Sequence, residues 1–329
     1  MSDYRPPLDD IRLVLDEISD LEALCDLPGY EHVDPDTIGG VLDELGRFVA
    51  EVVAPVDRIG DAEGCSVDDG VVTVPEAFSE AWDRFVDAGW GAISQDPDYG
   101  GGGFPGAVQT VMTEMLASAS RSWSMGPMLT VGALDALHSF ADEGQKEAYL
   151  PKMVSALWSG TMNLTEPQAG SDVGALTTKA VPQDDGSYRI FGTKIFITFG
   201  EHELTENIVQ LVLARTPDSP PGTKGISLFI VPKYLVGDDG SLGERNDYKC
   251  LSVEHKLGLH ASPTCVLSYG DAGDGAVGHL VGEEHQGMRY MFKMMNNARL
   301  GVGVEGLAVS ERALQLAADY AVERRQGRA

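Results

Sequence analysis

The stretch LTEPQAGSD, residues 164 to 172, places two hydroxyl side chains, Thr165 and Ser171, in a loop beside two acids. It lies between an apolar run and a segment that alternates like a strand. Such a loop can present hydroxyls and backbone N–H groups to a ligand. It can equally be a plain turn in which both hydroxyls close local backbone groups, and the loop chemistry alone does not decide between the two interpretations.

Three further groups of residues have side chains suited to a ligand. The stretch GTKIFITFG, residues 192 to 200, sets an aromatic ring, Phe196, beside a hydroxyl, Thr198. The alternative is that Phe196 and Thr198 point to opposite faces of a strand, one buried and the other exposed to solvent. Arg299 in MNNAR and Arg324 in ERRQ carry guanidinium groups, which suit carboxylate or phosphate oxygens. Their alternatives are a pairing with an acid on an acidic surface and a solvated helix end.

Metal chemistry is not indicated by the histidines or the cysteines. His255 and His260 are spaced HxxxxH and His202 lies in GEHE, with no third ligand suggested. The four cysteines are far apart and lack a CxxC spacing, so we expect reduced, structural thiols.

Hydrophobic periodicity divides the chain into three zones. Helical spacing predicts an N-terminal helical domain over 1–157, with breaks at 27–31, 96–106 and 124–127 and a short extended excursion near 61–74. A period of two predicts a middle β-barrel-like domain over 158–283. The helical period returns over 284–329, the beginning of a C-terminal helical bundle, where an apolar face has nothing local to bury it. The predicted class is an α+β multidomain protein.

Composition excludes several classes of protein. The 329 residues include 43% hydrophobic residues, enough for packed cores. A net charge of -27 argues against a nucleic-acid partner, because phosphates would be repelled. No run of eighteen apolar residues and no secretory leader is visible, so we expect a cytoplasmic protein without a membrane anchor.

The order of these motifs across helical, β and helical zones resembles the acyl-CoA dehydrogenase family of flavoproteins. The stretches that carry the resemblance are QKEAYLPKMVSALWSGTMNLTEPQAGSD, GTKIFITFG, HKLGLHASPT, MNNARLGVGVEG and YAVERRQGRA. The start PPLDDIRLVLDEI, the segment LPGYE and the closing ERRQGRA look most like the long branch that contains the 3-methylmercaptopropionyl-CoA dehydrogenases. Members of that branch are much longer, so the resemblance implies a chain truncated at its C-terminal end.

The resemblance implies FAD as cofactor and an acyl-CoA as substrate. Phe196 stands where many relatives carry Trp, and Arg324 would reach the FAD pyrophosphate of a neighbouring subunit. Ser171, Asn296 and Arg299 would contact the thioester substrate. The cofactor-binding residues carried over are Met162, Leu164, Thr165, Gly170, Ser171, Phe196, Ile197, Thr198, Arg324 and Gln326.

The implied reaction is α,β-dehydrogenation of the thioester to the 2-enoyl-CoA, which needs a carboxylate base. One position that supplies this base in the family is Ala298 here, and a methyl group cannot take a proton. Glu305 is a weak substitute that we expect on a surface or interface, so the base is expected beyond residue 329 and the chain alone should be inactive. Electron-transfer flavoprotein is the implied electron acceptor, and a homodimer or homotetramer the implied assembly. The alternatives are a non-dehydrogenating flavoprotein of the alkylation-response type and an inactive, cofactor-free remnant.

Overall fold

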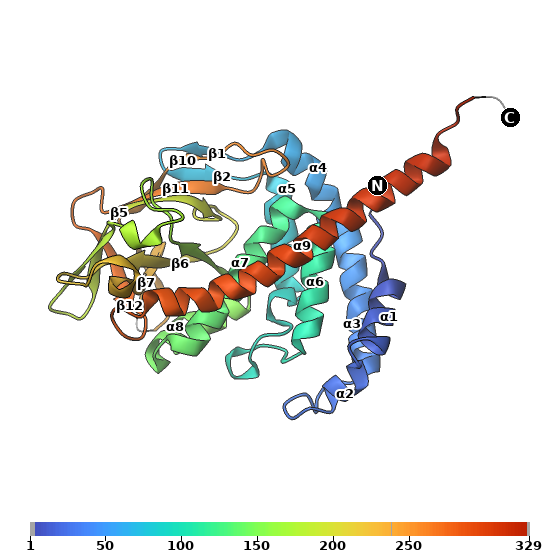
Figure 1. Cartoon of the computed structure of the whole chain (residues 1–329), viewed down its shortest axis with the longest axis horizontal. Coiled ribbons are helices and arrows are strands. Elements are labelled where there is room, and N and C mark those ends of the chain that lie inside the picture. The colour runs from blue at the N-terminus through green and yellow to red at the C-terminus, as the bar shows by residue number, and fades with distance from the viewer. Residues whose placement is uncertain (1–3, 238, 328–329) are drawn as a thin grey trace.

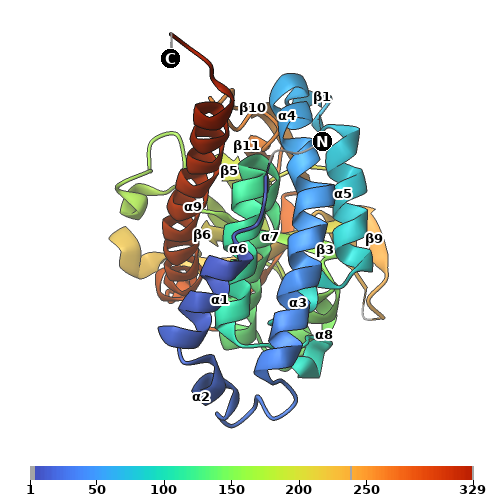
Figure 2. The same cartoon turned by 90° about the vertical axis from the view of Figure 1, so that its right-hand side faces the viewer.

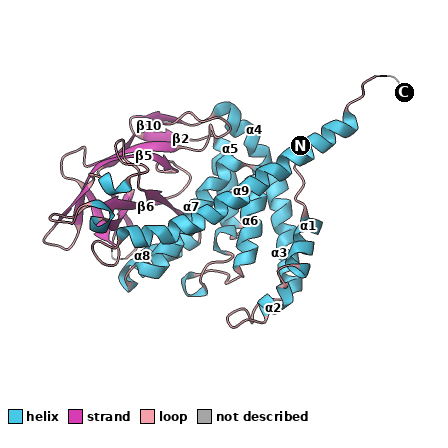
Figure 3. Cartoon of the chain, viewed as in Figure 1, coloured by secondary structure: helices cyan, strands magenta, loops and turns pink. Residues whose placement is uncertain are grey.

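The computed structural model describes residues 4–237 and 239–327. Helices gather on one side of the molecule and strands on the other, and one long helix, α9, crosses between them (Figures 1 and 3). The first half of the chain is helical. Its helices are α1 (Leu8–Glu17), α2 (Leu21–Cys25), α3 (Pro35–Phe48), α4 (Ala54–Glu63), α5 (Glu76–Asp87), α6 (Gly106–Ala119), α7 (Arg121–Phe140) and α8 (Glu143–Val154).

Helix starts in this half follow ordinary capping chemistry. The Asp34 side chain accepts a hydrogen bond from the Thr37 amide at the start of α3, and Pro35 occupies the first turn. Asp142 and Gln145 form a reciprocal capping box at the start of α8. The expected breaks at 27–31 and 96–106 lie between helices, and the extended excursion is the hairpin β1 (Ser66–Asp68) and β2 (Val71–Thr73).

The break expected at residues 124–127 is wrong, because α7 continues through Pro127. Pro127 lies beyond the first turn of α7, so it removes one helical hydrogen bond. Burial of Gly126, Pro127 and Met128 offsets that loss. Gly126 allows the close packing: a Cβ there would lie 2.8 Å from the Trp82 ring and 3.0 Å from the Phe199 ring. Tertiary contacts therefore keep the helix continuous where local sequence predicts a stop.

The second half is built around one eight-stranded sheet. The strands of the sheet are β3 (Trp158–Asn163), β4 (Lys179–Pro182), β5 (Tyr188–Thr198), β6 (Asn207–Ala214), β7 (Ser227–Pro232), β10 (Tyr248–Val253), β11 (Thr264–Tyr269) and β12 (Ala276–Leu280). The main path runs β10-β11-β5-β12-β7-β6-β3, and β4 pairs with β5. Among the strand pairs of the described residues, β3 and β6 are parallel and the others are antiparallel. A separate ribbon consists of β8 (Tyr234–Val236) and β9 (Leu242–Arg245).

The sheet is not a closed barrel within the described residues, since β3 and β10 end the path without pairing to each other. The free edge of β3 meets α7 instead. There the Gly160 amide donates a 3.1 Å hydrogen bond to the Thr130 hydroxyl of α7. A helix side chain thus satisfies an edge donor that another strand would satisfy in a barrel.

Helix α9 (Gly287–Glu323) begins after β12 and runs beside α6 and α7 (Figure 2). Its buried residues end at Ala308, and its last turns project away from the body of the molecule (Figure 1). The expected apolar face without local cover is confirmed here by exposed side chains, namely Leu300, Val302, Leu307, Val309, Leu314, Leu316, Tyr320 and Val322.

The architecture is therefore an N-terminal helical region, a middle β sheet and the first helix of a C-terminal helical region. The division at residues 157 and 283 stays a prediction. Among the helices described, none is both long enough and apolar enough to cross a membrane. The four cysteines are free thiols.

Candidate functional site

Two motifs far apart in the sequence meet where β3 and β5 end. The Thr161 hydroxyl donates a 2.7 Å hydrogen bond to the Thr198 carbonyl, and the Ile195 amide donates one of 2.9 Å to the Thr165 carbonyl. The Lys194 ammonium donates one of 3.0 Å to the Leu164 carbonyl. Backbone and side-chain contacts therefore place residues 162–165 directly beside residues 194–198.

A β-bulge sets the direction of the Phe196 side chain. Cys265 and Leu267 of β11 face Ile197 and Lys194 of β5, so Ile195 and Phe196 together oppose one residue. Phe196 has a φ of 59° and is 58% exposed, whereas Ile197 beside it is 2% exposed. Bulges beside functional sites commonly redirect a side chain in this way. The left-handed backbone of a bulky residue costs about 1–3 kcal/mol, which the surrounding sheet must offset.

The simple strand alternative for Phe196 and Thr198 does not match the structure. Neither residue is buried: Phe196 is exposed and Thr198 is half-buried. The Ile197 side chain packs into the core of the sheet, so only its backbone faces the candidate site. Met162, Leu164 and Thr165 are half-buried, like Thr198, so each keeps part of its surface exposed.

A buried carboxylate shapes the loop that carries Thr165 and Ser171. One oxygen of Glu166 accepts hydrogen bonds from the Thr178 amide (3.0 Å), the Thr178 hydroxyl (2.5 Å) and the Lys194 ammonium (2.8 Å). The other accepts from the amide and hydroxyl of Thr177 and from the Gln168 amide group, at 2.6 to 3.0 Å. This arrangement closes the loop onto β5.

Burial by itself would raise the pKa of Glu166, but the Lys194 ammonium and the surrounding donors outweigh it and lower the pKa to about 2. Burial lowers the pKa of Lys194 to about 8 against the opposing effect of Glu166. Both groups are therefore charged at neutral pH. Neither residue of this pair is among the site residues expected from the sequence. The available signal was Lys194 itself, a charged residue in phase with the buried Ile190 on an alternating strand.

Gly170 and Ser171 lie on the exposed outer part of this loop. A Cβ at Gly170 would lie 3.5 Å from the Thr165 methyl, so the loop folds back over Thr165. Ser171 therefore lies at the outer edge of the motif.

On α9, Arg299 and Asn296 are both exposed and share a 3.0 Å hydrogen bond. The Arg299 guanidinium also lies 5.3 Å from the centre of the Phe292 ring. Ala298 between them is half-buried.

A cavity of about 280 Å³ lies between α6, α7 and α9. Asn297 and Leu300 line it, so they bring the Asn296–Arg299 segment to its wall, and Asn297 donates a hydrogen bond to Asp135 across it. Thr165, Phe196 and Thr198 do not line this cavity. Its lining is Ser94, Gln95, Gly106, Gln109, Thr110, Thr113, Val131, Asp135, Asn297, Leu300, Gly301 and Val304.

The structure places Glu305, Arg324 and Gln326, three residues considered in the sequence, at or just after α9. Glu305 is not a surface residue: it is 3% exposed, and its carboxylate lies 2.7 Å from the Arg121 guanidinium of α7. Burial raises the pKa of Glu305, and Arg121 opposes that rise. Arg324 and Gln326 are exposed beyond the end of α9. The structure does not bring them to residues 162–165 and 194–198, which we call the β3–β5 site.

The histidines have structural partners. His202 is fully buried and contacts Ser159, and the rings of His255 and His260 lie 4.6 Å apart with His260 bonded to Asp61. In residues 4–237 and 239–327, no three His, Cys, Asp or Glu side chains gather as metal ligands would.

Two family models match the chain. Residues 40–156 match the acyl-CoA dehydrogenase N-terminal domain, and residues 161–272 match the acyl-CoA dehydrogenase middle domain. The chain is 50% identical over 325 residues to the 3-methylmercaptopropionyl-CoA dehydrogenase of Ruegeria pomeroyi, covering 99% of this chain and 55% of that protein. The chain thus spans about half the length of the curated relatives it matches.

Solved structures agree with this assignment. Butyryl-CoA dehydrogenase from Megasphaera elsdenii superposes with a TM-score of 0.72 at 25% identity, over 89% of this chain and 71% of that chain. A structure described as an electron transferring flavoprotein of Acidaminococcus fermentans superposes with a TM-score of 0.73 at 27% identity, over 89% and 70% of the two chains. With two domain models matched in order, and with a relative 50% identical over 99% of this chain, the chain belongs to the acyl-CoA dehydrogenase family.

Proposed function

We propose that this chain is the flavin- and thioester-binding part of an FAD-dependent acyl-CoA dehydrogenase. The observation that carries the proposal is the junction of β3 and β5. There a bulge turns Phe196 outward while three hydrogen bonds hold Leu164, Thr165 and Thr198 beside it. An aromatic face next to hydroxyl and backbone polar groups suits a ring that is apolar on its faces and polar along one edge.

The residues of the site fit an isoalloxazine. Phe196 and Leu164 would provide apolar contacts, and the Thr165 and Thr198 hydroxyls would bind the polar edge. The Phe196 ring can stack but, unlike Trp, offers no N–H donor. When bound, the flavin accepts the β hydride of the acyl group. The protein's own task is to hold ring and thioester in contact and to keep water out.

The substrate proposal rests on α9 and on the loop of residues 164–172. Arg299 and Asn296 would bind the polar part of an acyl-CoA, with Ser171 on the opposite side. The acyl chain would enter the cavity between α6, α7 and α9, whose wall continues from Asn296 to Leu300. The identity to the Ruegeria pomeroyi protein makes 3-methylmercaptopropionyl-CoA the first thioester to test.

Removal of the α proton requires a carboxylate that neither candidate on α9 provides. Ala298 has no acidic group, and Glu305 is paired with Arg121 inside the helical region. We therefore assign the base to a residue outside these 329 positions.

The proposed electron acceptor is electron-transfer flavoprotein, a proposal supported by the structural neighbour from Acidaminococcus fermentans that is described as an electron transferring flavoprotein. Arg324 directly follows the last residue of α9, and that end of α9 projects away from the sheet (Figure 1). This position supports a homo-oligomer in which Arg324 contacts FAD bound by a neighbouring subunit, where a guanidinium would pair with pyrophosphate oxygens.

The test uses the complete polypeptide that carries these residues. It should purify yellow or take up FAD, and 3-methylmercaptopropionyl-CoA or another acyl-CoA should bleach the flavin absorbance anaerobically. A colourless protein that takes up no added FAD overturns the flavoprotein assignment. Bound FAD that no acyl-CoA in a panel of straight, branched and thioether thioesters bleaches overturns the dehydrogenase assignment.

A further inference from the structure

A network of buried polar side chains links residues 162–165 to the end of β5, which carries residues 196–198. Gln210 of β6 donates a 2.6 Å hydrogen bond to the Gly200 carbonyl, two residues after Thr198. Its amide oxygen accepts a 2.8 Å hydrogen bond from Asn163, the residue between Met162 and Leu164. Gln210 and Asn163 are completely buried. One side chain therefore holds both segments at once.

Further hydrogen bonds fix the orientation of the Asn163 and Gln210 side chains. Tyr269 donates a 2.8 Å hydrogen bond to the Asn163 side-chain oxygen, so the Asn163 amide has one orientation that satisfies both neighbours. The Gln210 amide group also contacts the Tyr248 hydroxyl at 3.2 Å. All four side chains are at most 3% exposed.

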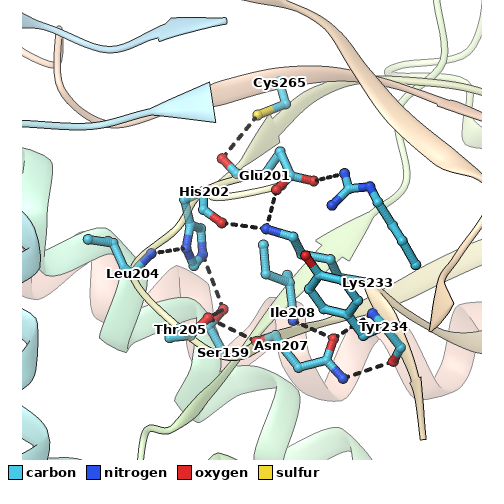
Figure 4. A network of polar contacts seen from close by, with 12 residues as sticks. Ser159, Glu201, His202, Leu204, Thr205, Asn207, Ile208, Lys233, Tyr234 and Cys265 are labelled. Carbon is cyan, nitrogen blue, oxygen red and sulfur yellow. Dashed lines mark hydrogen bonds and ion pairs between the residues drawn. The ribbon is translucent and has the colours of Figure 1, made fainter. Parts of the chain in front are cut away.

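Buried charges hold the turn that follows Thr198 (Figure 4). The Glu201 carboxylate lies 2.5 Å from the Lys233 ammonium and 2.9 Å from the Arg245 guanidinium. Lys233 also donates a 2.8 Å hydrogen bond to the His202 carbonyl. The turn after β5 is thus attached by side chains to the residue that follows β7 and to β9, in addition to the Gln210 contact with Gly200.

The His202 ring attaches the same turn to β3 (Figure 4). Burial, reinforced by the Lys233 ammonium, lowers the pKa of His202 to about 3, so the ring is neutral. Its Nδ1 accepts a 3.2 Å hydrogen bond from the Leu204 amide, which leaves Nε2–H to donate to the Ser159 hydroxyl at 3.1 Å. Ser159 and Thr161 of β3 therefore both reach the end of β5, through His202 and through Thr198 respectively.

Burying so many polar side chains costs free energy of folding. Each buried polar group loses water and must regain every hydrogen bond, and apolar side chains of equal volume often give equal or greater stability. A complete network of this kind holds the protein in one geometry, whereas a network with unpaired groups destabilises the folded state. The geometry it specifies here is the separation between residues 162–165 and residues 196–198.

We propose that Gln210 is a positioning residue for the flavin: it sets the relative position of Leu164–Thr165 and Phe196–Thr198 through its two hydrogen bonds. This proposal rests on the proposed function. It predicts that loss of Gln210 changes how flavin binds, beyond any effect on folding, although the side chain touches neither ring nor substrate.

The test compares Gln210→Met with a matched control, Asn246→Leu, in the complete polypeptide. Asn246 is also a buried amide of the β region, bonded to the Pro232 and Val277 carbonyls at 3.0 and 2.9 Å, but it contacts neither motif. Both variants should lower the melting temperature of the apoprotein. Only Gln210→Met should weaken FAD binding, about tenfold or more by fluorescence titration, and alter the visible circular dichroism of the bound flavin.

A milder variant covers the case in which Gln210→Met does not fold. Tyr269→Phe removes only the hydroxyl that orients Asn163. It should weaken FAD binding and change the flavin spectrum in the same direction. Its control is Tyr188→Phe, which removes a surface hydroxyl bonded to Glu284 at 3.0 Å and should leave both unchanged.

Equal FAD affinity and an unchanged flavin spectrum in Gln210→Met, or in Tyr269→Phe where the first variant is insoluble, overturn the positioning role. Equal losses of affinity in Gln210→Met and Asn246→Leu also overturn it, because a general loss of stability then explains both. Failure of the wild-type protein to bind FAD is a different result: it removes the proposed function, and this inference with it.

Discussion

Replacing Glu166 by Gln tests whether buried charge maintains the loop of residues 164–178. The change keeps the shape of the side chain and removes its charge. In the folded protein the pKa of Glu166 falls from 4.5 to about 2, which corresponds to about 3 kcal/mol of stability at pH 7. The pKa of Lys194 falls from 10.5 to about 8, a cost of similar size, so the intact pair contributes little net stability.

Removing one partner is different from removing the pair, because a neutral glutamine side chain would leave the Lys194 ammonium buried without a counter-charge. We expect Glu166→Gln to lower the free energy of unfolding by about 3 to 5 kcal/mol at pH 7. The matched control is Glu143→Gln, which breaks the exposed ion pair with Lys146. That change should cost about 1 kcal/mol or less. Urea unfolding followed by circular dichroism measures both.

The pH dependence gives an independent check on the same reasoning. The folded pKa of Glu166 lies below its unfolded value, so the unfolded state binds the proton more readily between about pH 4.5 and pH 2. Its stabilisation is complete above pH 4.5 and is lost as the pH falls toward 2. The stability gap between wild type and Glu166→Gln should therefore narrow from pH 7 toward pH 3. A gap no larger than that of Glu143→Gln, or one that stays constant with pH, would refute the argument.

Three further predictions concern the bulge and α9. Phe196→Asn should change stability by less than about 1 kcal/mol, since Asn tolerates a left-handed backbone better than Phe, but should weaken FAD binding about tenfold through loss of the ring; a marked loss of stability with unchanged FAD affinity would contradict this. Gly287→Ala should destabilise by about 1–3 kcal/mol, because the new Cβ would lie 2.6 Å from the Leu228 amide nitrogen, whereas Gly303→Ala, with open space around it, should stabilise by about 0.5–1 kcal/mol; thermal melts that place both on the same side of wild type would disprove the packing argument. Glu305→Leu should lower the unfolding free energy by about 3 kcal/mol by leaving Arg121 unpaired, and the double change with Arg121→Met should recover most of that loss; additive losses in urea unfolding would show that the buried pair is not coupled.

Local sequence patterns were sufficient to predict most helices and strands and to recognise the family. Apolar spacing located the helical first half, alternation located the sheet, and the motif at residues 164–172 with that at 192–200 identified the flavoprotein family, because these features are read over short stretches. The prediction was wrong at Pro127, where packing of Gly126 against two aromatic rings keeps α7 continuous. The sequence did not show that the barrel-like sheet stays open within the described residues, with α7 at the edge of β3.

The position of Glu305 was also wrong, because an acid on a helix gives no local sign of the arginine that lies opposite it on another helix. The partners of Lys194 and Gln210 could not be predicted for a similar reason: Glu166 lies 28 residues from Lys194, and Asn163 lies 47 residues from Gln210. The sequence by itself determined which residue types are present at the proposed site, namely an aromatic ring, hydroxyls and guanidinium groups. Only the tertiary structure decided that Phe196 faces outward and that two distant motifs meet, because a bulge and a set of buried hydrogen bonds exist only after the strands have paired.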